Sequence, residues 1–384
     1  MRVKIVHLVT RLDLGGAQQN TLHTARNLDP KRFEVVLACG PGGLLDAEAL
    51  NSLGVRTAFI DSLRREISPF YDLLALLEIA KLLLAEKPVL LHTHSSKAGI
   101  LGRLAAALAG VPVVVHTYHG FGFHDRQRAV VKTLYVALER LCARFTDALV
   151  FVSRANIDYA AAHGLVRPQD AVLIRSGVSL AGLPAKVDAV KLKTSAGIGM
   201  HKPLVLSVGN LKPQKNAADF VAAAAKVLTE VPEARFVFIG DGPQKSALQA
   251  RAFVLGLEGK VLFLGWRRDT AQWLAAADVF VMTSLWEGLP RALVEAMKSG
   301  LPSVCYATDG VVDLLKDGDN GFLIKPGDQD ALAARLTQLL KDESLRRKLG
   351  TAASASIGPE FDIDGMVRSQ EALYDRLMTD RRLV

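Results

Sequence analysis

The chain has 384 residues, about twice the length of a typical domain, and half of them are apolar while 22% are charged. This composition excludes a disordered chain, and since no apolar run reaches about 18 residues, we expect no transmembrane helix. The cysteines Cys39, Cys142 and Cys305 lie far apart, which argues against a disulfide framework or a zinc site and favours a cytoplasmic protein.

The formal charge of +8 is concentrated in the first half of the chain. Residues 1–183 carry 21 Lys and Arg against 15 Asp and Glu, and they hold eight of the nine histidines. A basic first half indicates an anionic partner, such as a phosphorylated substrate or a lipid surface. No motif for nucleic-acid binding is present.

In the first half, short runs of Val, Ile and Leu alternate with longer helical patterns. Strands are predicted at 3–9, 33–39, 55–60, 89–94, 111–118 and 148–153, and helices at 17–28, 72–86 and 99–110. Apolar strands that alternate with helices are typical of a parallel sheet covered on both faces. We therefore predict a Rossmann-like α/β domain over residues 1–183.

The pattern pauses over residues 177–203, where Gly, Pro and Lys are frequent, and we place the linker there. It restarts with predicted strands at 203–209, 234–242, 260–265, 278–284, 301–306 and 321–324. Residues 184–360 should form a second Rossmann-like domain, and the helix within 361–384 should pack back on the first. We expect the two doubly wound domains to face each other across a cleft, with ligands at the carboxyl ends of the strands.

The first loop of interest is RLDLGGAQQN, in which Gly15 and Gly16 precede a helix that starts near Ala17. Glycines there allow backbone N–H groups to approach a phosphate at a helix N-terminus. The spacing is not G-x-G-x-x-G, and a tight turn without a ligand explains the glycines equally well.

The second loop follows the strand at 111–118 and contains a cluster of histidines, His116, His119 and His124. We expect His116 to point into the sheet on the same face as Tyr118, whereas His119 falls where the strand gives way to the loop. A histidine at a strand's carboxyl end can donate, accept or take up a proton near pH 7. A loop histidine satisfied within the protein is an equally good interpretation.

The third loop, LSVGNLKPQKN, contains Gly209, Asn210, Lys212 and Lys215, and Lys215 falls at the start of a helix. A helix N-terminus favours anions over cations. A lysine at that place makes sense if a phosphate binds beside it, although a solvated lysine is the commoner case.

The fourth loop lies in SLWEGLPRALVEAMKSGLPSV, residues 284–304. Pro290 suits the first turn of a helix, so Glu287 lies before that helix and Glu295 just over one turn inside it. Carboxylates accept hydrogen bonds from sugar diols, and both could point toward a ligand at the helix N-terminus. Glu287 alone could instead interact with the helix dipole, whereas Glu295 stands among apolar neighbours.

Together these loops resemble the retaining glycosyltransferases of the GT-B fold, family 4, over essentially the whole chain. The most specific motif is the pair Glu287 and Glu295 within EGLPRALVEAMKSGLPSV. GGAQQ, TYHG, VGNLKPQK and IGDGP follow in the family's order.

The resemblance implies a role for each of these residues. His119, Lys215 and Glu287 would be catalytic: His119 beside the reacting sugar, Lys215 on the donor diphosphate and Glu287 on the sugar hydroxyls. Glu295 would hold the ribose, and residues 264–269 would adjoin the base. The remaining donor-binding residues would be Gly16, Gly209, Asn210, Gly288, Leu289 and Pro290. One departure is Asn210, where the family commonly has arginine; Lys212 could replace that cation.

The resemblance implies a hexosyltransferase that moves a sugar from a nucleotide-diphosphate donor and retains the anomeric configuration. The donor base that the family most often uses is uridine, so we expect a UDP-sugar. We predict no catalytic metal and no cofactor, because cations and helix N-termini can stabilise the leaving diphosphate. A carboxylate nucleophile and same-face attack assisted by the leaving phosphate both remain open.

The acceptor class suggested by the family is a lipid-linked saccharide of cell-surface polysaccharide synthesis, although soluble acceptors remain open. Residues 123–145 include a basic helix over 126–144, with Arg126, Arg128, Lys132, Arg140 and Arg144 against Asp125 and Glu139. Such a helix could lie on an anionic membrane at the inner face, or it could be an ordinary surface helix.

Two other functions are compatible with the predicted fold. A UDP-sugar 2-epimerase would bind the same donor and isomerise it without an acceptor, but the paired glutamates and GGAQQ favour a transferase. A non-catalytic nucleotide-sugar binding protein would explain Asn210 as decay, but the joint presence of His119, Lys215, Glu287 and Glu295 argues against it.

Overall fold

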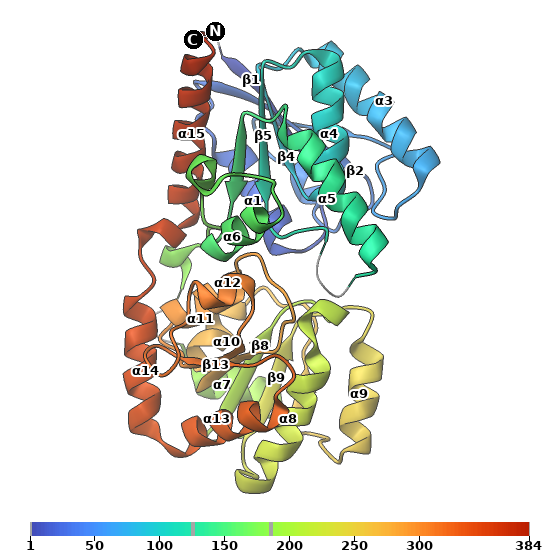
Figure 1. The fold of residues 1–384 in the computed structure, drawn as a ribbon. Coiled ribbons are helices and arrows are strands. Elements are labelled where there is room, and N and C mark those ends of the chain that lie inside the picture. The colour runs from blue at the N-terminus through green and yellow to red at the C-terminus, as the bar shows by residue number, and fades with distance from the viewer. Residues whose placement is uncertain (1, 124–126, 184–186, 384) are drawn as a thin grey trace. The chain divides into compact units, whose positions relative to one another are not determined.

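A computed structural model describes residues 2–123, 127–183 and 187–383 of the chain. The chain divides into two compact units (Figure 1). Unit 1 comprises Met1–Gly177 with Ile363–Val384, and unit 2 comprises Val178–Asp362. The domain boundary expected at residues 183 and 184 falls at the edge of the described ranges, inside the stretch assigned to unit 2.

The described residues of unit 1 form a parallel sheet with strand order β3-β2-β1-β4-β5-β6-β7. Its strands are β1 (Val3–Arg11), β2 (Phe33–Gly40), β3 (Val55–Phe59), β4 (Leu90–His94), β5 (Val113–Tyr118), β6 (Ala148–Phe151) and β7 (Val172–Leu173). The sequence predicted β1 to β6, and these predictions are confirmed. It missed β7, because a two-residue edge strand is too short to show an apolar pattern.

Helices cover both faces of this sheet. They are α1 (Gly16–Asn27), α2 (Asp46–Leu50), α3 (Pro69–Glu86), α4 (Ser96–Ala109), α5 (Ala129–Ala143), α6 (Arg154–Ala162) and α15 (Ile363–Asp380). Ile5 and Val9 of β1 pack with α1 and α15, whereas Val6 and Leu8 pack with α3 and α4. Successive side chains of a strand point to opposite faces, so the apolar residues at positions 5, 6, 8 and 9 of β1 bury both faces of the sheet.

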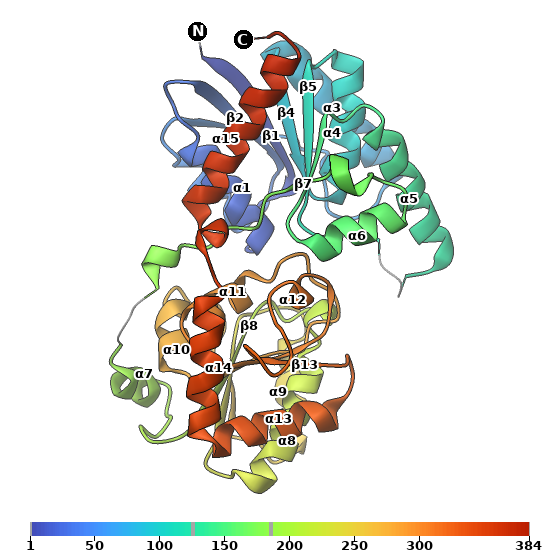
Figure 2. The same ribbon diagram turned by 60° about the vertical axis from the view of Figure 1, so that its left-hand side comes forward.

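The C-terminal helix α15 belongs to unit 1 although it follows all of unit 2 in sequence (Figure 2). Its buried residues Val367, Leu373, Tyr374 and Met378 join the same core cluster as α1 and β1. The apolar spacing of these residues is that of a helix with one face on a core.

Unit 2 repeats the same construction with strand order β10-β9-β8-β11-β12-β13, again with parallel pairs throughout its described residues. The strands are β8 (Leu204–Val208), β9 (Arg235–Ile239), β10 (Val261–Phe263), β11 (Val279–Met282), β12 (Ser303–Tyr306) and β13 (Phe322–Ile324). Each lies within a predicted strand, so the predicted α/β class is confirmed.

The helices of unit 2 are α7 (Ala189–Ser195), α8 (Ala217–Glu230), α9 (Lys245–Val254), α10 (Thr270–Ala276), α11 (Arg291–Lys298), α12 (Asp309–Val312), α13 (Gln329–Lys341) and α14 (Glu343–Ala355). Local sequence sets several helix ends: Asp188, Asp328 and Asp342 accept hydrogen bonds from backbone N–H groups in the first turns of α7, α13 and α14. The expected linker at 177–203 therefore contains a short capped helix, which its Gly, Pro and Lys content did not suggest.

Both sheets have a topological switch point, where the strand order reverses. It lies between β1 and β4 in unit 1 and between β8 and β11 in unit 2. Ligands of doubly wound sheets bind at the carboxyl ends of the strands at such points. Among the residues that the structure describes, no helix is long and apolar enough to span a bilayer.

Candidate active site

The loops after β8 and β11 meet at the switch point of unit 2 and are held together by hydrogen bonds. Leu285 N donates to Gln214 O at 2.8 Å, and Gln214 Nε2 donates to Trp286 O at 2.8 Å. The Thr283 hydroxyl oxygen lies 3.0 Å from the carbonyl oxygen of Lys215. These contacts fix the position of the backbone that carries Lys215 relative to the backbone that carries Glu287.

Lys215 Nζ and Glu287 Oε1 form an ion pair across these two loops. Only 18% of the Lys215 side chain and 8% of the Glu287 side chain are exposed, so the pair is shielded from bulk water. The backbone N–H of Glu287 donates to Asp309 Oδ2 at 3.0 Å, which ties the same loop to α12. A shielded pair is electrostatically stronger than a surface pair, and each partner depends on the other for charge compensation.

Glycines of neighbouring loops pack directly on this backbone. A Cβ at Gly240 would lie 1.7 Å from Gly209 O, and a Cβ at Gly310 would lie 1.9 Å from Gly288 O. Gly240 N also donates to Gly265 O at 2.8 Å, which joins this layer of loops to residues 264–269. Any side chain at Gly240 or Gly310 would displace the segments that position Lys215 and Glu287.

Gly209 lies against the Lys215 side chain, and Asn210 follows Gly209 in the same loop. A Cβ at Gly209 would lie 3.2 Å from Lys215 Cε, so the lysine stem runs across the bare face of this glycine. The side-chain oxygen of Asn210 is buried and has no hydrogen-bond partner within the described part of the chain. The Asn210 side chain therefore has an unused acceptor in the loop that carries Lys215.

Glu295 lies on α11, which begins after Pro290, as the sequence predicted. Leu293, Val294, Ala296 and Met297 are buried, whereas Glu295 is half-buried. Burial raises the pKa of Glu295, and the positive charge of Arg291, one turn earlier, partly opposes that effect. Gly288, Leu289 and Pro290 form the approach to this helix N-terminus, where backbone N–H groups can meet an anion.

Sequence reasoning missed Arg291, Asp309 and Gly310 as parts of this site, and it noted Gly240 only as part of the motif IGDGP. Arg291 sits four residues before Glu295, a spacing that places two helical side chains on one face and could have been noticed. The contacts of Asp309, Gly240 and Gly310 join loops that are distant in sequence, so no local sequence pattern predicts these contacts.

In unit 1, α1 begins at Gly16, close to the predicted start, and Gly15 is its extended N-cap residue without a side-chain cap. Its first N–H groups lie at the carboxyl end of β1, at the switch point of that unit. This agrees with the expected geometry for Gly16.

The histidines after β4 and β5 separate into two kinds. His116 is buried, and its Nδ1 lies 2.8 Å from Thr93 Oγ1, so it is a satisfied core histidine. His119 is half-buried in the loop after β5, and its Nε2 lies 3.2 Å from Nδ1 of His94. His124 lies outside the described residues.

A cluster of metal-ligating groups also lies in unit 1. Ligand atoms of His7, His92 and His94 are all within 4.8 Å of one another, and all three side chains are buried. His92 already bonds through both ring nitrogens, to the Tyr374 hydroxyl at 2.5 Å and to Thr117 Oγ1 at 2.7 Å. A metal ion would have to displace these bonds, so the donor set fits a hydrogen-bond network better than a metal centre.

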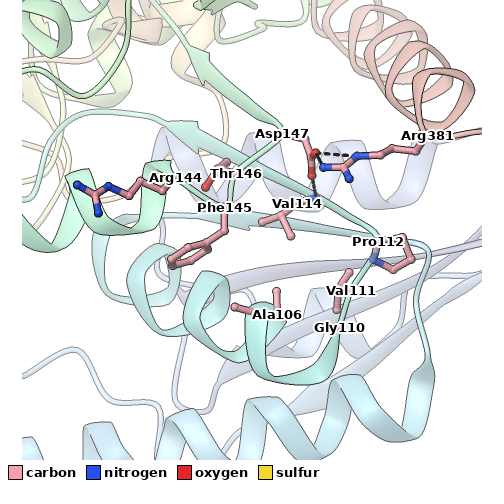
Figure 3. Close-up of a pocket in the computed structure, with 11 residues that line it drawn as sticks. Ala106, Gly110, Val111, Pro112, Val114, Arg144, Phe145, Thr146, Asp147 and Arg381 are labelled. Atoms are coloured by element: carbon pink, nitrogen blue, oxygen red, sulfur yellow. Dashed lines mark hydrogen bonds and ion pairs between the residues drawn. The ribbon is translucent and has the colours of Figure 1, made fainter.

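A surface hollow of about 410 Å³ in unit 1 is lined by Arg144, Asp147 and Arg381 (Figure 3). Asp147 binds Arg381 and accepts a hydrogen bond of 2.8 Å from Val114 N. The hollow lies where β5 and β6 begin, at the edge opposite the carboxyl ends of the strands. The Asp147–Arg381 ion pair joins the start of β6 to the end of α15, so it helps to hold α15 on unit 1. The hollow is separate from the candidate site in unit 2.

Comparison with known proteins bears on both units. The family model described as glycosyl transferase 4-like domain matches residues 15–177, and the model described as glycosyl transferases group 1 matches residues 190–356. The UDP-Gal:alpha-D-GlcNAc-diphosphoundecaprenol alpha-1,3-galactosyltransferase of Escherichia coli is 36% identical over 348 residues, covering 90% of this chain and 89% of the relative. The N-acetyl-alpha-D-glucosaminyl L-malate synthase of Bacillus anthracis is 28% identical, covering 81% of each chain.

Among solved structures, HepE of Anabaena in complex with UDP and glucose superposes with a TM-score of 0.84 at 22% identity. The match covers 98% of this chain and 100% of that chain. At this identity the match supports the fold, and it confirms the predicted GT-B-like fold with its two parallel α/β sheets.

Proposed function

The chain belongs to the group 1 family of glycosyl transferases, and on that premise we propose that it transfers a hexosyl group from a UDP-sugar to a hydroxyl of a lipid-linked saccharide, with retention of configuration. The observation that carries the proposal is the shielded Lys215–Glu287 pair at the switch point of unit 2, with Glu295 on the next helix. This arrangement offers a cation for a diphosphate and two carboxylates for hydroxyl groups.

In the proposed reaction the bond between sugar C1 and the diphosphate oxygen breaks, and the acceptor oxygen bonds to C1 on the same face. The acceptor proton passes to the leaving diphosphate. Lys215 has three N–H donors, so it can keep its bond to Glu287 while it donates to phosphate oxygens. Negative charge builds on the diphosphate as it leaves, and a cation already fixed by Glu287 stabilises that charge without having to reorganise. This scheme requires no metal ion.

The choice of donor and acceptor is supported by the Escherichia coli relative, whose name pairs UDP-Gal with a diphosphoundecaprenol-linked sugar. The Bacillus anthracis relative is named for a product that joins a sugar to malate. A water-soluble acceptor is therefore the alternative against which a lipid-linked acceptor should be tested.

A lipid-linked acceptor requires the protein to approach a membrane surface, and α3 supports this part of the proposal. Phe70, Leu73, Leu77 and Leu84 recur at helical spacing along α3 and are each 55–66% exposed. The acids of α3 are each bound within unit 1: Asp72 to Lys97, Glu78 to Ser62 and Glu86 to Lys4. The outer face of α3 is therefore apolar and carries little negative charge.

The basic helix expected over 126–144 is α5, except that Arg126 lies outside the described residues. Its Val130 and Leu134 are exposed, as are Arg128, Arg140 and Arg144. Glu139 does not offset this charge at the surface, because it is buried against Arg103. In Figure 1, α3, α4 and α5 lie side by side on unit 1, with α4 in contact with both neighbours. Apolar and basic side chains together favour an anionic lipid surface.

We would test the reaction by proton NMR with UDP-galactose, UDP-glucose and their N-acetyl forms, with a short-chain polyprenyl-diphosphate-linked sugar, with malate, or without acceptor. We expect a new α-linkage only with the lipid-linked sugar. A changed C2 coupling in the nucleotide sugar without acceptor would identify an epimerase, and transfer to malate would reassign the acceptor.

Membrane contact is tested by co-sedimentation with vesicles of phosphatidylcholine alone or with phosphatidylglycerol. Replacing Phe70 and Leu73 by serine should reduce binding to anionic vesicles roughly 10-fold or more, since each buried side chain of this kind is worth about 1.5–3 kcal/mol. Phe253 and Val254 of α9 are similarly exposed, and their replacement by serine is the matched control. Equal loss in both variants would contradict the assigned surface.

A further inference from the structure

The residue that follows Lys215 has an unusual backbone conformation. Asn216 has a φ of 46° and a ψ of 45°, in the left-handed region that residues other than glycine rarely adopt. It connects the short 3₁₀ helix Pro213–Lys215 to α8, so its conformation sets the direction in which the chain leaves Lys215. Asparagine tolerates this region better than most residues do, but its Cβ is still crowded there.

A buried carboxylate holds the Asn216 side chain. Asp219 lies in the first turn of α8 and is 9% exposed, and its Oδ2 accepts a hydrogen bond of 2.7 Å from Asn216 Nδ2. The backbone N–H of Asp219 also donates to Asn216 O at 3.0 Å. The two residues are therefore joined through both side chain and backbone, which stabilises the left-handed turn.

The same carboxylate is anchored to two other elements of unit 2. Its Oδ2 accepts a hydrogen bond of 2.7 Å from the hydroxyl of Tyr306, at the end of β12. Its Oδ1 accepts one of 2.6 Å from Gln329 Nε2, at the start of α13. Burial and the bond to Asp219 raise the pKa of Tyr306, so its hydroxyl keeps the proton that it donates. All three side-chain donors are neutral, so an amide oxygen could accept from them as well.

Through Tyr306 the carboxylate is also connected to the loop that holds Glu287. The chain continues from Tyr306 to Asp309, whose Oδ2 accepts the hydrogen bond of 3.0 Å from Glu287 N. Asp219 therefore lies where the segment that follows Lys215 meets the strand that leads to Asp309. Loss of this carboxylate should change the position of Lys215 relative to Glu287.

We propose that Asp219 is a positioning residue, which holds Asn216 in the left-handed conformation and thereby directs the Lys215 ammonium toward Glu287 and the donor diphosphate. The diphosphate contact rests on the proposed function, whereas the effect of Asp219 on Asn216 does not. Thr283 supports the same turn separately, because its hydroxyl oxygen lies 3.0 Å from the carbonyl oxygens of both Lys215 and Asn216. A glycine at position 216 should therefore keep the turn without a side-chain bond.

The conformation of Asn216 is measured from the Cα and Cβ chemical shifts of the full chain, isotope-labelled at asparagine, with Asn216→Ala used to assign the signals. Asp219→Leu should move these shifts away from left-handed values. Asp219→Asn should preserve them, because its oxygen can accept from Asn216 and Tyr306 while Gln329 turns its amide to accept from the new N–H. Unchanged Asn216 shifts in folded Asp219→Leu would overturn the proposal.

UDP affinity, measured by titration calorimetry, tests the consequence for Lys215. Asp219→Leu should raise the Kd for UDP roughly 10-fold, the loss expected when one charge-assisted contact to a phosphate is broken. With the UDP-sugar, kcat should fall as well, because a misplaced Lys215 stabilises the leaving diphosphate less well. Asp219→Asn should restore most of both losses.

Tyr306→Phe is the matched control, because it removes one bond to the same buried carboxylate and leaves the bond to Asn216 in place. It should lower Tm without changing the Kd for UDP or kcat. An equal loss of UDP affinity in Tyr306→Phe and Asp219→Leu would mean that Asp219 acts through general stability, and this would overturn the positioning role.

Position 216 provides a test that does not depend on whether Asp219→Leu folds. Asn216→Ala removes the side-chain bond and keeps a Cβ that disfavours the left-handed region, whereas Asn216→Gly removes the same bond and adopts that region readily. We expect weaker UDP binding in Asn216→Ala and nearly wild-type binding in Asn216→Gly. Added to Asn216→Gly, Asp219→Leu should lower Tm without further loss of UDP affinity. Equal UDP affinities in Asn216→Ala and Asn216→Gly would overturn the proposal.

Lys215→Ala separates this proposal from the proposed function. If Asp219→Leu changes the Asn216 shifts while Lys215→Ala binds UDP like the wild type, Asp219 does position Asn216, and the diphosphate contact assigned to Lys215 is wrong. If Lys215→Ala weakens UDP binding while Asp219→Leu keeps wild-type shifts and affinity, the assigned diphosphate contact stands and the role of Asp219 is wrong.

Discussion

Lys215 and Glu287 are 72 residues apart in sequence, and their side chains pair at the carboxyl ends of β8 and β11. The hydrogen bonds that join Gln214 to Leu285 and Trp286, one from the backbone and one from its side chain, bring the two loops together independently of the ion pair. Removing either charge should therefore leave the other at nearly the same place, so the two residues can be examined one at a time.

The first prediction concerns opposite effects of the two charges on UDP binding. If Lys215 binds the diphosphate as proposed, Lys215→Ala removes a charge-assisted contact worth about 1.5–3 kcal/mol, so the Kd for UDP should rise roughly 10-fold or more. Glu287→Ala leaves an unpaired lysine, so UDP should bind as tightly as to the wild-type protein or more tightly, while turnover is lost. Titration calorimetry measures the first quantity, and NMR of the sugar measures the second.

Lys226→Ala is the matched control, because Lys226 is an exposed lysine of α8 that pairs with Asp330. It should change neither UDP binding nor turnover. Wild-type turnover in Glu287→Ala, or wild-type UDP affinity in Lys215→Ala, would remove these residues from the site.

The second prediction concerns the pH dependence contributed by Glu295. Burial raises the pKa of this carboxyl, with Arg291 opposing the effect. As pH falls through the raised value, the carboxylate gains a proton and loses the capacity, expected from the family resemblance, to accept hydrogen bonds from two ribose hydroxyls. As the pH is lowered, UDP affinity should therefore begin to decline at a higher pH than it would if Glu295 had the pKa of an ordinary glutamate, about 4.3. The measurement is the Kd for UDP against pH, for the wild type and for Glu295→Gln. The ratio of the two Kd values at each pH removes the contribution from titration of UDP itself, because that contribution is the same for both proteins.

The same shift has a consequence for stability. Between the ordinary and the raised pKa, the folded protein binds more protons at Glu295 than the unfolded chain does, so the free energy of unfolding falls as pH rises through that window. Urea unfolding of the wild type and of Glu295→Gln across the window should show this slope only in the wild type. Parallel curves would mean that Glu295 titrates normally.

Much of the fold was readable from sequence because it depends on local patterns. The apolar runs that became β1 to β6 and β8 to β13 needed only their composition and spacing, and Pro290 marked the start of α11. The short β7 and the capped helix α7 carry too little pattern to be found this way. Glu139 counted as a surface acid on a basic helix, but its partner Arg103 lies on α4, which no helical spacing within α5 could reveal.

The candidate site, like the fold, could be predicted only where it depends on local sequence. The residue types at Lys215, Glu287 and Glu295 stood out from their local context, whereas the contacts that position them come from other loops. Asp309 holds the backbone of Glu287, and Gly240 lies against the backbone of Gly209. The contact between His7 and His94 could not be predicted either, because it joins residues of separate strands whose register is known only from the folded sheet.

The third prediction concerns Gly240. It has a φ of +140°, and a Cβ there would lie 1.7 Å from Gly209 O, so alanine must displace the loop that carries Asn210 and Lys215. We expect Gly240→Ala to lower Tm and to weaken UDP binding at least as much as Lys215→Ala does. Gly256 also has a positive φ, but a Cβ there would meet nothing within 4 Å. Gly256→Ala should cost only the backbone strain of about 1–2 kcal/mol and should leave UDP binding unchanged.

The fourth prediction concerns the buried pair Arg103–Glu139 beneath α5. Glu139 Oε2 lies 2.5 Å from Arg103 Nη2 and accepts a hydrogen bond of 2.6 Å from the Tyr118 hydroxyl, and all three side chains are buried. Glu139→Ala leaves the guanidinium charge of Arg103 without its carboxylate, and breaking a pair of this kind costs about 3–5 kcal/mol. Urea unfolding should show that loss.

The double variant Arg103→Met with Glu139→Leu separates burial of an unpaired charge from loss of packing. Replacing both partners by apolar side chains of similar size is often neutral or stabilising, so the double variant should recover most of the stability lost in Glu139→Ala. If it is as unstable as Glu139→Ala, the pair contributes through geometry at Tyr118 and Gly99 rather than through charge, since Arg103 Nε also donates to Gly99 O at 2.8 Å. Because Glu139 faces the core in either case, vesicle binding by the folded double variant should equal that of the wild type, which makes it a control for the surface of α5.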